Sequence, residues 1–232
     1  MNNSSDNKGK KILGYLFPGL ITLLVMLIVL VAKGIWPFGS SRIDLFDNMQ
    51  QVAPLYAHLW DAMHGDASIW FDWYTGLGTN VSMSMSAFSM ISPFNLFLYL
   101  CPRDYILEFI SVLTVIKTFV MSVTMYAFIN KRYNSLSYNI KALFAVAYAF
   151  CGYVLLYASC FTPWMDIVAL FPLLMMALDI MEKTGKKLFY IIMVAVMFII
   201  NYYLAAMSLV YILLVGGMYL IFMCDKKERC KK

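Results

Sequence analysis

Acidic side chains are concentrated in one stretch of the chain. Seven of the 13 Asp and Glu residues lie between positions 44 and 108, and an eighth, Asp166, follows Pro163-Trp164. Carboxylates can accept a proton from a reacting hydroxyl group and can bind cations. This stretch is therefore the first place to look for chemistry.

Besides Asp166, two further polar positions lie within apolar runs. Lys117 lies about midway along the run 105–130, where a charge is costly and needs a carboxylate, a carbonyl or a lipid phosphate as its partner. An ion pair between helices is the structural alternative for Lys117, and an ordinary helix start is the alternative for Asp166. Asn201, followed by Tyr202 and Tyr203, also needs a hydrogen-bonding partner in such surroundings.

The elements that must position these residues are membrane spans. The chain has 232 residues, of which 62% are hydrophobic and 13% charged, whereas a soluble domain is about half apolar and about a quarter charged. This composition excludes a soluble globular domain, and the 16% aromatic content argues against disorder. The net charge of +5 arises from short clusters between apolar runs, which excludes a nucleic-acid partner. Six runs approach the length of a span: residues 12–32, 105–130, 142–160, 164–182, 188–206 and 207–224.

The distribution of basic residues predicts the orientation of these spans. Six crossings place 14 of the 18 Lys and Arg residues on one side and 3 on the other, with Lys117 inside a span. The positive-inside rule then predicts a multi-pass cell-membrane protein with both termini cytoplasmic. We expect one membrane domain over 1–232, with cytoplasmic tails at 1–11 and 225–232 and an outer loop at 33–104. Residues 88–100 are short for a span, so we expect them at the outer interface or as a re-entrant piece.

The outer loop carries two patterns of its own. Apolar residues recur from Val52 to Met63 at three- and four-residue steps, which predicts an amphipathic helix suited to the membrane surface. An aromatic cluster follows at residues 70–74, suited to the headgroup layer or to stacking on a sugar ring. His58, Asp61 and His64 are conceivable metal ligands, but a solvated polar helix face is the favoured interpretation.

Several short motifs, taken in order, resemble those of a known family. They are Pro37-Phe38-Gly39, then Asp47, Gln51 and Pro54, Gly76-Leu77-Gly78, Ser92-Pro93-Phe94-Asn95, Lys117, Trp164-Met165-Asp166, Phe171-Pro172-Leu173 and Asn201-Tyr202-Tyr203. Their order and spacing across almost the whole chain resemble the bacterial membrane protein family YfhO. Val52 departs from the pattern, because the family usually has an aromatic residue there.

The resemblance implies a GT-C-like, all-α polytopic membrane protein with about six transmembrane helices. It implies a glycosyltransferase that moves a sugar from a polyprenyl-phosphate carrier to a cell-wall polymer such as teichoic acid on the outer face. Asp47 is then the expected catalytic base, with Asp44 as its competitor, and Asp166 completes the acidic site. No cofactor is certain, although the acids leave room for a divalent cation.

The remaining site residues follow from the same resemblance. Substrate contacts are expected at Gln51, Lys117, Trp164, Asn201 and Tyr202. Family members are several times longer, so the chain is expected to be a fragment, the product of a truncated gene or one half of a split protein. In the last case a second chain that supplies the missing spans is a further expected partner. Two other functions remain open: a non-catalytic assembly partner, and a lipid-linked-sugar flippase or transporter, which would carry polar pairs or broken helices near the midplane.

Overall fold

The structure is a computed structural model that describes residues 3–84 and 86–222. Within these residues it is an all-α protein without a β-strand, which confirms the predicted fold class. The seven long or apolar helices are α1 (Asn3–Ala32), α4 (Ile106–Arg132), α5 (Tyr138–Ala149), α6 (Gly152–Cys160), α7 (Met165–Thr184), α8 (Leu188–Ile200) and α9 (Tyr202–Phe222).

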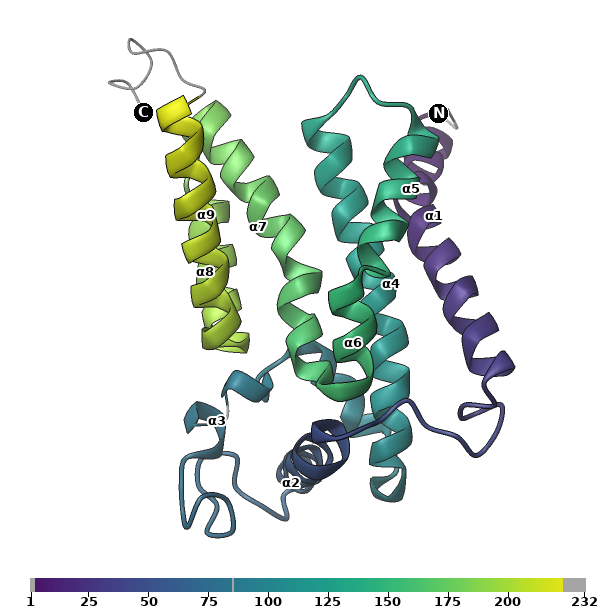
Figure 1. The fold of residues 1–232 in the computed structure, drawn as a ribbon, viewed down its shortest axis with the longest axis vertical. Helices are drawn as coiled ribbons and strands as arrows, with labels where there is room; N and C mark the ends of the chain where they lie inside the picture. The colour runs from purple at the N-terminus through teal and green to yellow at the C-terminus, as the bar shows by residue number, and fades with distance from the viewer. Residues whose placement is uncertain (1–2, 85, 223–232) are drawn as a thin grey trace.

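Helix α4 is the centre of the bundle and packs against α1, α5 and α7, while α8 joins α7 to α9. Small and polar side chains bring α1 close to α4: a Cβ at Gly19 would lie 2.7 Å from the Phe119 ring. Nearby, the hydroxyl oxygens of Thr22 and Ser122 are 2.7 Å apart. The start of α1 and the end of α9 lie at the same end of the bundle, and the loop between α1 and α4 covers the other end (Figure 1).

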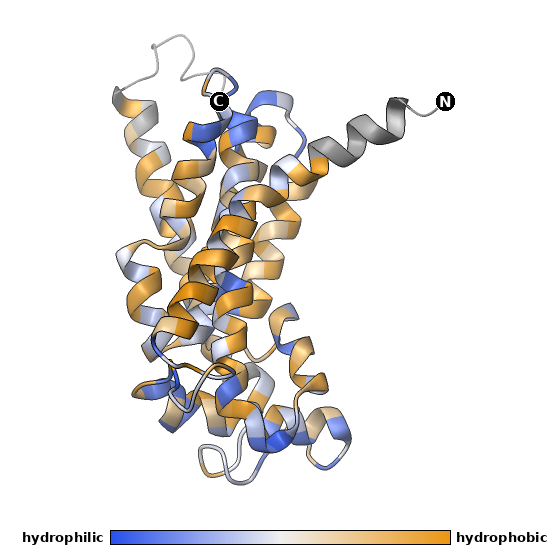
Figure 2. Cartoon of the chain, turned by 90° about the vertical axis from the view of Figure 1, so that its right-hand side faces the viewer, coloured by the Kyte–Doolittle hydropathy of each residue, from blue (hydrophilic) through white to orange (hydrophobic). Residues whose placement is uncertain are grey.

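Four stretches are long and apolar enough to cross a membrane: Ile12–Ala32, Arg103–Arg132, Tyr138–Cys160 and Thr162–Thr184. Figure 2 shows hydrophobic residues along the middle of the helices and hydrophilic residues gathered toward both ends. This distribution is that of a membrane protein. Which end of the bundle faces the cytoplasm stays a prediction.

The predicted boundary between the last two apolar spans is wrong. The chain turns at Asn201 instead of at 206/207, so α8 and α9 are Leu188–Ile200 and Tyr202–Phe222. Asn201 is extended, with φ −155° and ψ 95°, and its side-chain oxygen accepts a hydrogen bond from the Leu204 N–H at 3.1 Å. Asn201 is thus the N-cap of α9, a role for which Asn is favoured.

The predicted span 142–160 is also interrupted. Helix α5 ends at Ala149 and α6 begins at Gly152, because Cys151 is extended, with φ −66° and ψ 158°. Just before the interruption, the Tyr148 hydroxyl donates a hydrogen bond to the Val168 carbonyl at 2.7 Å, which connects this part of the chain to α7.

The outer loop forms short helices across the end of the bundle. They are the π-helical turn η1 (Asn48–Val52), α2 (Ala53–His64), α3 (Val81–Ser84) and the 3-10 helices η2 (Ser86–Phe88), η3 (Pro93–Leu100) and η4 (Arg103–Tyr105). The predicted amphipathic helix is present, but its apolar residues Val52, Tyr56 and Leu59 are buried by η3 and α4 rather than by lipid. Residues 88–100 do not span; Phe94 and Leu98 pack into the same cluster.

Candidate functional site

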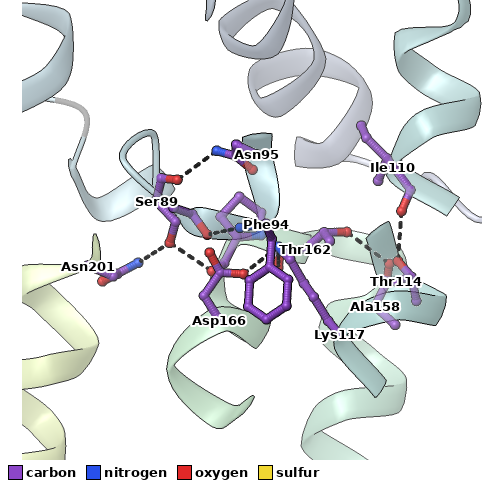
Figure 3. A network of polar contacts seen from close by, with 12 residues as sticks. Ser89, Phe94, Asn95, Ile110, Thr114, Lys117, Ala158, Thr162, Asp166 and Asn201 are labelled. Atoms are coloured by element: carbon purple, nitrogen blue, oxygen red, sulfur yellow. Dashed lines mark hydrogen bonds and ion pairs between the residues drawn. The ribbon is translucent and has the colours of Figure 1, made fainter. Parts of the chain in front are cut away.

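Lys117 and Asp166 form an ion pair where α4 meets the start of α7. Lys117 Nζ lies 2.5 Å from Asp166 Oδ1, and neither side chain is exposed to solvent. Lys117 Nζ also donates to the Thr162 carbonyl at 3.1 Å and lies 5.7 Å from the centre of the Phe94 ring (Figure 3). The charge within the apolar run therefore has an acid as its partner, one of the alternatives that the sequence left open.

Asp166 is enclosed as well as paired. Besides Lys117, the Ser92 side chain lies next to its carboxylate as a hydrogen-bond donor. The expected joint acidic site of Asp47 and Asp166 is not formed: Asp166 is fully buried against Lys117, whereas Asp47 is half-buried in the loop and contacts Gln51. Among the described residues, no group of three His, Cys, Asp or Glu side chains is placed to hold a metal ion.

The loop segment that carries Asp47 is anchored directly beside this pair. Asn48 is fully buried; its side-chain nitrogen donates to the Ser159 carbonyl at 2.9 Å and to Thr162 Oγ1 at 3.0 Å. In return, the Thr162 N–H donates to the Asn48 side-chain oxygen at 2.9 Å. Thr162 therefore links the Asn48 anchor to Lys117. Sequence reasoning missed Asn48, although an Asn directly after a candidate catalytic acid was a visible signal.

Asp47 itself bonds outside this buried network. Its carboxylate accepts a hydrogen bond from Gln51 Nε2 at 2.8 Å, across one turn of η1. The two residues singled out by the Asp47–Gln51 spacing therefore do meet. A carboxylate that is half-buried and bonded to only one neutral donor keeps free lone pairs for a substrate hydroxyl.

Asn201 joins the outer loop to the other side of the network. Its side-chain nitrogen donates to the Ala87 carbonyl at 2.7 Å and to Ser89 Oγ at 3.1 Å, and Ser89 Oγ donates to the Pro163 carbonyl at 2.8 Å (Figure 3). Asn95 donates to the Ser89 carbonyl at 2.9 Å. The hydrogen bonds of Asn201 are thus made within the chain.

Trp164 and Tyr202 differ in their surroundings. Trp164 lies among the rings of Tyr157, Phe161 and Tyr203, at centroid distances of 4.8, 5.0 and 5.9 Å. Its buried indole N–H has no hydrogen-bond partner. Tyr202 is 49% exposed. Trp164 therefore has a buried and unused donor, whereas Tyr202 has an open ring.

Asp44 is a second acid that the fold turns inward. It is 3% exposed, and neither carboxylate oxygen has a hydrogen-bond partner. Burial raises the pKa of Asp44 from 3.8 to about 7, with Arg42 lowering it and Glu108 raising it. The Arg42 side chain forms an ion pair with Glu108 instead. Both Nη2, at 2.8 Å, and Nε, at 3.0 Å, contact Oε1 of Glu108. Asp44 can therefore change its protonation state near neutral pH.

The residues His58, Asp61 and His64 have separate partners. A ring nitrogen of His58 lies 2.9 Å from the Ser68 carbonyl. Asp61 pairs with Arg103 at 2.7 Å, and hydrogen bonding from Arg103 lowers the pKa of Asp61. The His64 ring stacks on Trp60 at 3.7 Å. This arrangement is that of a polar helix face.

Two apolar cavities open beside the helices. One, of about 430 Å³, lies between α6, α7 and α9 and is lined by residues that include Cys151, Ile167, Phe171, Met207 and Tyr211. The other, of about 420 Å³, lies along α4 and η3 and includes Trp36, Phe97, Phe109, Val112 and Ile116. Neither cavity is lined by Asp47 or Asp166. Both are suited to hydrocarbon chains.

The profile of the family described as bacterial membrane protein YfhO matches residues 19–232. No curated protein and no solved structure matches the chain. The family match covers α1 from residue 19 onward, the outer loop, the buried Lys117–Asp166 pair and the helices that follow. The chain belongs to the YfhO family of bacterial membrane proteins.

Proposed function

We propose that the chain is a membrane glycosyltransferase, or part of one, that transfers a sugar from a polyprenyl-phosphate carrier to a cell-wall polymer such as teichoic acid. The proposal is supported by family membership together with a loop that carries several acids. In this arrangement both termini are cytoplasmic and the loop 33–104 lies on the outer face, where the carrier presents its sugar. A divalent cation and a second chain with further spans remain compatible partners.

In the proposed reaction, an acceptor hydroxyl attacks the anomeric carbon of the carrier-linked sugar. The bond between this carbon and the phosphate oxygen breaks, and its electron pair leaves with the polyprenyl phosphate. The hydroxyl proton goes to the Asp47 carboxylate, which acts as the general base. The hydrogen bond from Gln51 at 2.8 Å orients that carboxylate before the acceptor arrives.

The observation that carries the proposal is the anchoring of the Asp47 segment. Asn48 fixes the next residue of the chain to Ser159 and Thr162, and the Thr162 carbonyl holds Lys117 in turn. An accepting carboxylate is therefore held on a rigid support at the end of the bundle, as a catalytic group requires. The apolar cavities beside α4 and α7 offer places for the polyprenyl chain within the bilayer.

The other expected contacts receive narrower roles in this proposal. Lys117 and Asp166 neutralise each other, so they act by positioning Thr162 and its neighbours unless the pair opens toward the carrier phosphate. Asn201 positions the loop at Ala87 and Ser89. Tyr202 keeps an open ring that is available to a sugar, whereas the indole N–H of Trp164 is buried and supports the site through the aromatic cluster around it.

Replacing Asp47 tests the proposal. Asp47→Asn keeps the size of the side chain and its contact with Gln51 but removes the basic carboxylate. We expect sugar addition to fall by about 10²- to 10⁴-fold, the usual contribution of a general base. The measurement is glycan analysis of the wall polymer from cells that carry each variant, with membrane insertion checked in parallel.

Asp66→Asn is the matched control, because Asp66 is an exposed acid of the same loop. It should leave glycosylation unchanged, and Asp44→Asn should reduce it only mildly. Full glycosylation with Asp47→Asn would exclude this base. Loss with Asp44→Asn alone would move the role three residues upstream, and normal glycosylation with every variant would favour a non-catalytic assembly partner.

A further inference from the structure

A short turn of the outer loop displays large apolar side chains to solvent. Among residues 70–79, here called the aromatic turn, Trp73 is 74% exposed, Tyr74 98% and Leu77 98%. Trp70 and Phe71 are 66% and 43% exposed. Apolar side chains gathered in this way on a polar loop mark an interaction site.

The aromatic turn is held in one shape by its own contacts. Asp72 and Thr79 exchange two backbone hydrogen bonds of 3.0 Å. The Asp72 carboxylate accepts from the Thr75 hydroxyl at 2.6 Å and from the Tyr74 N–H at 3.2 Å. Because these bonds fix the backbone, little conformational entropy remains to be lost when a partner binds.

The rings themselves are also supported. Trp73 and Phe71 meet edge to face, with centroids 4.9 Å apart and planes at 83°. Both rings press on Gly78, where a Cβ would lie 3.2 Å from Trp73 and 3.3 Å from Phe71. Leu77, at φ +64°, adopts a conformation that residues other than glycine rarely take. The turn therefore presents these side chains outward instead of packing them against the loop.

The bilayer is a poor partner for this surface. In Figure 1 the chain between α2 and α3 loops past the ends of α7, α8 and α9, away from the apolar middle of the helices. The sequence between Arg42 and Arg103 contains no Lys or Arg but five Asp residues. A segment that docks on lipid phosphates normally carries basic residues. The same lack of cations disfavours a polyphosphate chain.

We propose that the aromatic turn binds neutral sugar units of a glycan, with Trp73 and Tyr74 stacking on the faces of the sugar rings. An aromatic face is electronegative and attracts the polarised C–H groups of a sugar ring without any need for charge. The acidic groups of the loop repel anionic segments, so the surface selects uncharged units. This inference rests on the proposed function and names the neutral sugar units attached to a wall polymer, and not its phosphate backbone, as the part that the loop binds.

The test is a binding titration with the full chain in lipid nanodiscs, followed by tryptophan fluorescence. The probes are neutral oligosaccharides of glucose, galactose and N-acetylglucosamine, with poly(glycerol phosphate) as the anionic probe. We expect a saturable change with at least one neutral series. Tyr74→Ala should weaken binding about tenfold, in line with the loss of one stacked ring. Trp73→Phe, which retains a ring, should bind nearly as well as the original chain.

Tyr99→Ala is the matched control, because Tyr99 is 56% exposed but lies on η3 outside the turn. It should leave binding unchanged. The proposal is overturned by no response to all three neutral series, by tighter binding of poly(glycerol phosphate), or by equal binding in Tyr74→Ala. It is also overturned if brominated lipids in the nanodisc quench an emission that Trp73→Phe removes, since the turn would then lie in the bilayer.

Neither binding nor quenching depends on sugar transfer, so this inference and the proposed function can fail separately. Sugar binding together with full glycosylation in Asp47→Asn cells would retain the aromatic turn and reject the base. Loss of glycosylation in Asp47→Asn cells, together with no sugar binding in the titration, would retain Asp47 as the base and reject the aromatic turn as a sugar site.

Discussion

The charge of Asp44 should set how the stability of the outer loop depends on pH. Burial raises its pKa from 3.8 to about 7, so the folded chain binds this proton more tightly than the unfolded chain does. The contribution of Asp44 to the free energy of unfolding is therefore fully present below about pH 4 and is lost as the pH rises through about 7. Asp44→Asn cannot ionise and should remove that loss.

The size of the effect follows from the shift. A change of about 3 pKa units corresponds to about 4 kcal/mol at 1.36 kcal/mol per unit, which is an upper bound because water can approach the carboxyl group. We expect Asp44→Asn to stabilise the chain by about 1–3 kcal/mol at pH 8 and by little at pH 4. For a chain of this length that gain raises the unfolding temperature by about 2–12 °C.

Thermal unfolding in detergent from pH 4 to pH 8 measures this difference. Asp66→Asn is the control, because Asp66 is exposed in the same loop and its replacement should leave the pH profile unchanged. Parallel profiles for the original chain and Asp44→Asn would refute the reasoning. Such a result would mean that the Asp44 carboxylate finds a partner or solvent when it ionises.

Two further predictions concern the buried ion pair and the topology. Lys117→Met should destabilise the chain by about 3–5 kcal/mol in detergent unfolding, because it leaves Asp166 buried without an ion-pair partner. The double variant Lys117→Met with Asp166→Asn should recover most of the lost stability. Equal stability of the single and double variants would contradict this prediction. The topology can be tested in a Cys-free background by adding an impermeant maleimide to intact cells. It should label a Cys placed at exposed Ser68 and should not label a Cys placed at exposed Lys186. Labelling at position 186 from outside would reject the predicted orientation.

Most helix positions could be predicted because charges flank the apolar runs. Lys33, Asp104 and Lys183 mark the ends of three spans within a few residues. The division between α8 and α9 was misplaced because the sequence on both sides is uniformly apolar. Only the capping preference of Asn201 marked the turn.

The candidate site was less predictable because its partners are distant in sequence. The need of Lys117 for a partner follows from its charge, but its pairing with Asp166 depends on how α4 packs against α7. Periodicity identified the buried face of α2, yet only the fold reveals that η3 and α4 cover it. Spacing also could not show that Asp44 turns inward while Asp47 stays half-exposed, because Asp44 lies in irregular chain and Asp47 begins the helical turn that follows it.

The early turn at Asn201 bears on the thickness of the surrounding membrane. Helix α8 has 13 residues, which cover about 20 Å at 1.5 Å per residue, whereas the hydrocarbon core of a bilayer is about 30 Å thick. The Asn201 amide meets Ala87 and Ser89 of the loop, so the polar turn is satisfied at a depth where lipid offers no hydrogen bonds. Lipids beside α8 must shorten or tilt to match this helix, and this hydrophobic mismatch concentrates on the flank where the loop reaches deepest.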